Sequence, residues 1–347
     1  MPTESIDAFF ACTLLVSVAL LATASLAGTM QARIDKLPDF NKNDYLNAIA
    51  EYILTNSGSP ADWGATGTAP LTFGLSRSGS NLLYEVDIDK ISRLNNKSSY
   101  ALSYVQAINA ARLQNIAFGI SVSQILSIDV ELAKVVSSES LTEYTFTTTV
   151  KHATGPVNAT LQCYVVAGDF TSSVYNTTLR TGLGYINVQI PNSASGPALL
   201  IIFARAAFDE RITSYAAYSF AHLSQEPESN FTFLTLSPLN YTLSVVYNFP
   251  NVTINKAYAF SYNYQTNLTA LSAASYAIPR WVDESPIVLV ACGYNGTTPF
   301  IEWTAYPNVP FNFGANFEDA EQNTFSYVVI IKETFYQVTI SFGDVKG

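Results

Sequence analysis

The sequence is poor in charge and in the residues that perform most enzyme chemistry. Charged residues make up 13% of the chain, about half of the ~25% usual in soluble domains. The two histidines, His152 and His222, each end a predicted strand far from the other, so neither a zinc site nor a catalytic triad is indicated. Nucleophile-elbow, phosphate-loop and dinucleotide motifs are also absent. We therefore expect no enzyme activity and no cofactor.

Basic residues and cysteines are scarce as well. The 17 Lys and Arg against 27 Asp and Glu give a net charge of −10, so no basic patch for nucleic acid is expected. Cys12, Cys163 and Cys292 are too widely spaced for a disulfide framework. We interpret them as small buried hydrophobic residues, with a Cys163–Cys292 bridge as the less favoured reading. The acidic segment 87–90 lacks the glycine and the closing glutamate of a calcium loop. The acidic run 318–321 is interpreted as a solvated loop, with weak calcium binding as the less favoured reading, so no metal site is predicted.

The most distinctive feature present is a charge-free run over residues 8–30. At a rise of 1.5 Å per residue, its 23 residues are long enough to span a ~30 Å hydrocarbon core. A cleaved signal peptide would begin with basic residues, but Glu4 and Asp7 precede the run. A simple anchor would place Lys or Arg on its cytoplasmic side, but Arg33 and Lys36 follow the run. A third reading is a helix that packs against copies of itself, where the two acids meet a partner's N-terminal amine.

The third reading is supported by a family resemblance. Residues 3–11, Thr-Glu-Ser-Ile-Asp-Ala-Phe-Phe-Ala, followed by the apolar run, resemble the start of archaeal type IV pilin-like proteins. The resemblance implies a class III signal that is cut just before this segment and a helix that assembles into a filament core. The basic stretch that precedes the cut in that family is missing, which fits a mature chain or a start codon assigned too late. The residues expected to act in assembly are Glu4, Asp7, Phe9, Phe10, Leu14, Leu15, Val18 and Leu21.

Eight Asn-x-Ser/Thr sequons form the second strong signal. They are Asn96, Asn158, Asn176, Asn230, Asn240, Asn251, Asn267 and Asn295. Chance accounts for about half of them in a chain so rich in Asn, Ser and Thr. Their absence before Asn96 fits a chain whose start is held in a membrane or filament core while the rest is exposed to glycosylation. We expect N-linked glycans at these positions, on surface loops and strand ends.

Residues 38–114 predict a small mixed module. Pro38 ends the first helix, and apolar residues at helical spacing predict a second helix over 41–55. A strand at 82–86, a helical turn at 89–94 and a helix at 100–113 follow. The Trp63-Gly64 and Phe73-Gly74 pairs are interpreted as core packing.

From residue 115 onward, apolar and polar residues alternate, which is the spacing of a half-buried strand. About seven short strands in roughly 95 residues, among them 144–150, 198–204 and 214–220, predict an immunoglobulin-like sandwich over 115–225. The diagnostic Cys…Trp…Cys spacing is absent, so the prediction rests on strand pattern. A polar bridge at 224–229 leads to a second predicted sandwich over 226–347, which ends in a hairpin turning near 332–334.

Together these patterns predict an α+β, mainly β chain: an apolar helix (1–37), a small mixed module (38–114) and two β-sandwich domains (115–225 and 226–347). The expected function is an extracellular, glycosylated, pilin-like structural subunit. Its partners would be copies of itself, the membrane during export, and an envelope layer or external surface. The alternative is a membrane-anchored surface glycoprotein or pseudopilin that tethers binding domains. An exported hydrolase with a shallow carbohydrate site is the weakest reading.

Overall fold

The computed structural model describes residues 42–113, 116–225, 227–280, 285–317 and 322–344. The predicted apolar helix, all eight assembly residues and the acidic segment 318–321 lie outside these ranges. Contacts divide the chain into a unit of residues 1–48 and a compact unit of residues 49–347, and the second unit is described below. Within the described ranges, no helix has both the length and the apolar character needed to cross a membrane.

The α-helices of the described ranges fall in the predicted module 38–114. They are α2 (Lys42–Thr55), α3 (Ile88–Leu94) and α4 (Tyr104–Ala111). The Asp87 side chain caps α3 by accepting the backbone N–H groups of Asp89 and Lys90. Ser103 and Gln106 form a reciprocal capping box at the start of α4. The capping residues thus determine where both short helices begin.

The strand expected at 82–86 is not a regular strand. Tyr84 has a φ of 59°, and Leu82 and Leu83 are exposed. Within this segment, Glu85 and Val86 form isolated bridges, to Ile330 and Ser76 respectively. The left-handed backbone at Tyr84 interrupts the alternation, so the apolar residues before it turn toward solvent.

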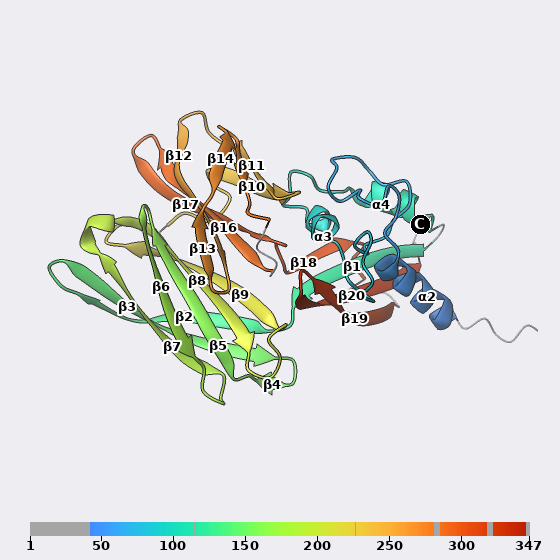
Figure 1. Cartoon of the computed structure of the whole chain (residues 1–347), viewed down its shortest axis with the longest axis horizontal. Coiled ribbons are helices and arrows are strands. Elements are labelled where there is room, and N and C mark those ends of the chain that lie inside the picture. Colours follow the sequence, from blue (N-terminus) through green and yellow to red (C-terminus); the bar gives the residue numbers. More distant parts are fainter. Residues whose placement is uncertain (1–41, 114–115, 226, 281–284, 318–321, 345–347) are drawn as a thin grey trace, which may run out of the picture. The chain divides into compact units, whose positions relative to one another are not determined.

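A four-stranded antiparallel sheet joins segments from the two halves of the chain. It has the order β18 (Phe311–Gly314), β1 (Ile116–Gln124), β20 (Thr334–Asp344), β19 (Asn323–Ile331). β1 pairs with β20 along its whole length, with Ile116 opposite Asp344 and Gln124 opposite Tyr336. Figure 1 shows the teal β1 lying among the red C-terminal strands. We refer to residues 49–124 and 311–344 as the base module.

This pairing differs from the expected sandwich over 115–225, which included residues 116–124. Long-range pairing partners leave no trace in the local apolar period, so the period alone could not assign β1 to its sheet. The C-terminal hairpin matches its prediction. Lys332 and Glu333 form its two-residue turn with φ values of 49° and 64°, the left-handed backbone that tight hairpin turns require.

The first sandwich contains two antiparallel sheets that enclose one apolar core. One sheet holds β2 (Ser127–Ser137), β3 (Leu141–His152), β4 (Gly155–Pro156) and β7 (Leu183–Pro191). The other has the order β6 (Phe170–Thr177), β5 (Ala159–Ala167), β8 (Gly196–Ala206), β9 (Thr213–His222). Side chains from both sheets, such as Phe146, Ile186, Leu200 and Phe220, form the core. The alternating pattern of β3 and β7 therefore has its apolar side inward.

The second sandwich is built in the same way. One sheet has the order β10 (Leu234–Leu239), β11 (Thr242–Tyr247), β15 (Ser275–Ala277), β14 (Thr269–Ser272). The other has the order β13 (Tyr264–Asn267), β12 (Val252–Ser261), β16 (Ile287–Asn295), β17 (Thr298–Tyr306). Phe233 and Phe300 stack with ring centroids 5.2 Å apart. β16 is buried on both faces from Ile287 to Gly293, which explains its unbroken apolar run. The chain is thus mainly β, with sandwich-like pairs of sheets.

Candidate functional site

The sequon asparagines all lie at the surface of the described structure. Asn96, Asn158, Asn240, Asn251 and Asn267 are exposed, and Asn176, Asn230 and Asn295 are half-buried. Several occupy turns or strand ends: Asn240 lies between β10 and β11, and Asn251 lies between β11 and β12. An N-linked glycan needs an accessible amide, and none of these eight residues is buried.

The side-chain amides of three sequon residues already have partners. Asn230 donates from Nδ2 to the Trp303 carbonyl across 2.8 Å and accepts the Trp303 N–H at 3.0 Å. Asn176 donates from Nδ2 to the carbonyl of Tyr185. Asn240 instead accepts from Arg280 through Oδ1, which is not the atom that a glycan bonds. Asn230 therefore has a structural role that a glycan on Nδ2 would disturb.

Neither histidine lies in a reactive arrangement. His222 is buried, with Nδ1 2.9 Å from the Tyr144 hydroxyl and Nε2 3.0 Å from the Pro191 carbonyl. His152 lies 2.9 Å from the Thr154 hydroxyl on the surface. In the part of the chain that the structure describes, no three His, Cys, Asp or Glu side chains are grouped to hold a metal ion.

Cys163 and Cys292 are both free and buried. Cys163 belongs to the core of the first sandwich, and Cys292 lies on β16 of the second. Burial raises the pKa of both thiols far above their usual value, so neither forms a nucleophilic thiolate near neutral pH. Both behave as small apolar residues.

The most unusual chemistry of the described residues is a group of buried charges on α3. Asp89 accepts the Tyr306 hydroxyl at 2.5 Å and the Asn240 backbone N–H at 2.8 Å. Burial raises the pKa of Asp89, although both hydrogen bonds act in the opposite direction. These two bonds join α3 of the base module to strand ends of the second sandwich. We refer to Asp89, Lys90, Arg93 and their partners as the α3 junction.

Both cations of the α3 junction bind backbone carbonyls. Lys90 Nζ donates to the carbonyls of Ser57 and Ser76 at 2.8 and 2.7 Å. Arg93 is 2% exposed and donates to three carbonyls, those of Trp63, Thr68 and Tyr100. Burial lowers the pKa of Lys90. Buried charges that are hydrogen-bonded to the backbone fix loop geometry, and here they hold the loops on either side of Trp63.

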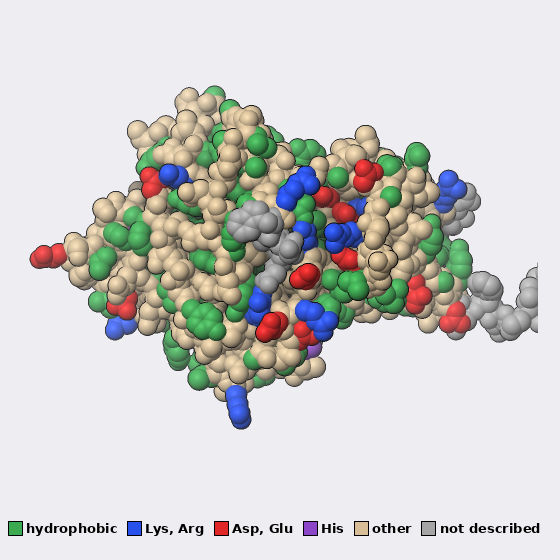
Figure 2. Space-filling model, viewed as in Figure 1, with side chains coloured by type: hydrophobic (Ala, Val, Ile, Leu, Met, Phe, Trp, Pro, Cys, Tyr) green, Lys and Arg blue, Asp and Glu red, His purple; other side chains and the backbone are tan. Residues whose placement is uncertain are grey.

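A cation–π stack lies beside this junction. The Tyr241 ring has Lys332 Nζ 4.6 Å and the Arg280 guanidinium 5.1 Å from its centroid. Figure 2 shows charged side chains gathered around α3, while much of the sandwich surface on this face is uncharged. The α3 junction therefore holds segments of the base module and the second sandwich together. Sequence analysis missed it because a short Asp-Lys-x-x-Arg turn ordinarily indicates a solvated helix face.

Comparisons with known proteins give no family. No family model matches the chain, and no curated protein matches it. Among solved structures, the chain is similar to HBP35 of Porphyromonas gingivalis, with 13% identity, 54% of this chain and 64% of that chain covered, and a TM-score of 0.20. It is also similar to human GIVD cytosolic phospholipase A2, with 8% identity, 67% of this chain and 33% of that chain covered, and a TM-score of 0.15. Likenesses at such scores carry no functional argument.

Proposed function

We propose that this chain is a glycosylated, extracellular structural subunit of a pilin-like filament. The N-terminal helix would pack with copies of itself in the filament core, and the sandwiches would form the exterior. Apolar burial supplies the cohesion, because each buried CH₂ contributes about 0.8 kcal/mol.

The observation that carries this proposal is the placement of the eight sequon asparagines. All of them have non-buried side chains, and they are distributed over the base module and both sandwiches. A chain whose exterior carries glycans needs such sites on every exposed part.

The runner-up is a membrane-anchored surface glycoprotein that tethers the sandwiches to the cell envelope. It requires the same glycans and the same apolar segment, but no assembly of helices. The two functions differ in what the purified protein forms once detergent is removed.

Electron microscopy and glycopeptide mass spectrometry test the proposal together. We expect filaments from material purified from the native producer, with hexose-containing modifications on several sequon asparagines. Single particles alone, even at high protein concentration, would favour the anchored alternative. Peptides without modification at all eight asparagines would reject the glycoprotein part of the proposal.

A further inference from the structure

Two adjoining cavities form a cleft between the first and second sandwiches. Their volumes are about 340 and 380 Å³, within the range of small-molecule sites. The residues common to both cavities are Pro197, Pro299, Phe300 and Ile301. We refer to the two cavities as the inter-sandwich cleft.

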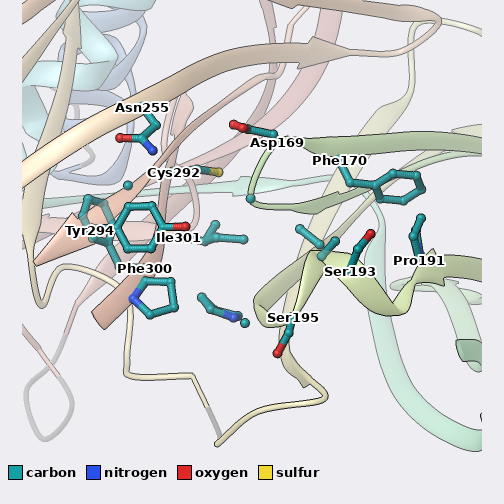
Figure 3. A pocket seen from close by; sticks show the side chains of 17 residues that line it. Asp169, Phe170, Pro191, Ser193, Ser195, Asn255, Cys292, Tyr294, Phe300 and Ile301 are labelled. Atoms are coloured by element: carbon teal, nitrogen blue, oxygen red, sulfur yellow. The ribbon is translucent and has the colours of Figure 1, made fainter. Parts of the chain in front are cut away.

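The two sides of the cleft come from different sandwiches. Asp169 of the β5–β6 turn and Phe170, the first residue of β6, line it together with Ser193 of the 3₁₀ turn Asn192–Ala194. Figure 3 shows Tyr294 and Asn255 across the cavity from these residues. Gly168, at a φ of 59°, provides the tight turn that brings Asp169 to the edge of the cleft.

A β-bulge places Asn255 in this lining. The β12–β16 register passes from Ile254 opposite Gly293 to Lys256 opposite Cys292, so Asn255 is the extra residue. A bulge changes the direction of the side chain it carries, and bulges are frequent beside binding sites. Gly293 has no room for a Cβ, which would overlap the Thr253 carbonyl oxygen. The bulge therefore presents the side-chain amide of Asn255 to the cleft and interrupts the regular pairing of β12 with β16.

Direct contacts between the two sandwiches hold the sides of the cleft together. The Tyr164 hydroxyl donates to the Ser261 carbonyl at 3.1 Å, and the Tyr164 and Phe260 rings lie 5.0 Å apart. The Thr160 and Tyr262 hydroxyls lie 2.7 Å from each other. These bonds between the sandwiches leave the cleft preformed, so a ligand would lose little binding energy to closing it.

The lining determines which ligand chemistry fits. Among the described residues of both cavities the charged side chains are Asp169, Glu228 and Glu302, and none is basic. Glu302 is already bound by the backbone N–H groups of Phe231 and Phe233. Phosphates, sulfates and uronic acids would be repelled by the remaining carboxylates. Hydroxyl and amide groups beside aromatic and proline rings suit a ligand with polar edges and apolar faces.

We propose that the inter-sandwich cleft binds a neutral saccharide. Tyr294 offers a ring face and a hydroxyl, and Asp169 accepts hydrogen bonds from sugar hydroxyls, which are stronger for being charge-assisted. Two sources share this chemistry, a glycan on another copy of the chain and an external polysaccharide. Asn295 is a less suitable source, because successive side chains of a strand point to opposite faces and Tyr294 faces the cleft.

The proposal is tested by titrating the full chain, in detergent, with maltotriose, cellotriose and mannotriose. Ligand-observed NMR measures the binding of each trisaccharide. We expect at least one to bind, about tenfold more weakly to Tyr294→Ala and about fivefold more weakly to Asp169→Asn. The matched controls Tyr185→Ala and Asp129→Asn alter exposed residues away from the cleft and should bind as the unchanged chain does. Trigalacturonate should not bind.

Three results would overturn the proposal: no neutral trisaccharide bound at millimolar concentration, equal binding by both cleft variants and the unchanged chain, or equal binding of trigalacturonate.

Enzymatic deglycosylation distinguishes the two sources of the saccharide. Tighter binding after deglycosylation supports the cleft with glycans of other copies as ligands, and unchanged binding supports it with an external polysaccharide. Filament formation is measured separately, so failure here would leave the proposed structural function untouched.

Discussion

Tyr306, the last residue of β17, donates its hydroxyl hydrogen to Asp89 on α3 across 2.5 Å. The two residues are 217 positions apart, and both are almost fully buried. The contact joins the base module to the second sandwich, so its removal should lower the stability of the whole compact unit.

Asp89→Ala is expected to lower the free energy of unfolding by about 2–3 kcal/mol, because it leaves a buried hydroxyl and a backbone N–H without their acceptor. Asp89→Asn keeps an oxygen at the same place and should cost clearly less. Chemical denaturation monitored by tryptophan fluorescence measures both. Equal stability of Asp89→Ala and the unchanged chain would show that the hydrogen bonds of Asp89 contribute nothing to the stability of the fold.

Stability should rise on acidification from neutral pH. Burial raises the pKa of Asp89 and Glu302 above their usual values of 3.8 and 4.5, so the folded state binds these protons more readily than the unfolded state. Their favourable contribution is present at low pH and is lost as pH rises through the raised pKa values. Glu85 acts oppositely, since hydrogen bonds from Ser80 and Arg77 outweigh its desolvation and lower its pKa.

Thermal unfolding between pH 7 and pH 4 checks this dependence. The midpoint should increase toward acid, and Asp89→Asn should flatten the slope, because the amide has no proton to gain. A midpoint that falls steadily over the same interval would mean that carboxylates with lowered pKa values, such as Glu85, dominate.

Glycan occupancy should follow the surroundings of each amide. We expect high occupancy at Asn96, Asn158, Asn251 and Asn267, which are exposed, and low occupancy at Asn230, whose amide binds Trp303. Asn230→Ala should also destabilise the second sandwich by about 1–3 kcal/mol, because it leaves the N–H and the carbonyl of the half-buried Trp303 without this partner. Glycopeptide mass spectrometry and denaturation provide the two readouts, with Asn158→Ala as the control. Full occupancy at Asn230 would contradict the expectation.

Glu4→Ala is expected to impair filament assembly or export while the β domains remain folded, because the acid is predicted to meet a partner's N-terminal amine in an apolar core. Filament counts by electron microscopy report assembly, and circular dichroism reports the fold. Glu139→Ala, at an exposed turn, serves as the control. Normal filaments from the Glu4 variant would remove this residue from the mechanism.

The predictable parts of the fold are those with a strong local signal. Alternation at residues 144–150, the apolar run at 198–204 and the final hairpin all reappear as β3, β8 and β19–β20. β2 went unrecognised although Ile128, Val130 and Leu132 alternate with polar residues at its start, because the alternation breaks at the bulge between Leu132 and Lys134 and the rest of the strand is exposed. The pairing of β1 with β20 and the burial of Arg93 depend on partners far along the chain, so no local pattern encodes them.

The register of β1 with β18 has one more consequence. Val122 and Phe311 lie opposite each other, so the chain leaves the base module and returns to it at neighbouring points. Both sandwiches are therefore a single insertion with adjacent ends, the arrangement in which whole domains are most easily exchanged. A chain built this way can change the size or the surface chemistry of its sandwiches while the base module stays the same.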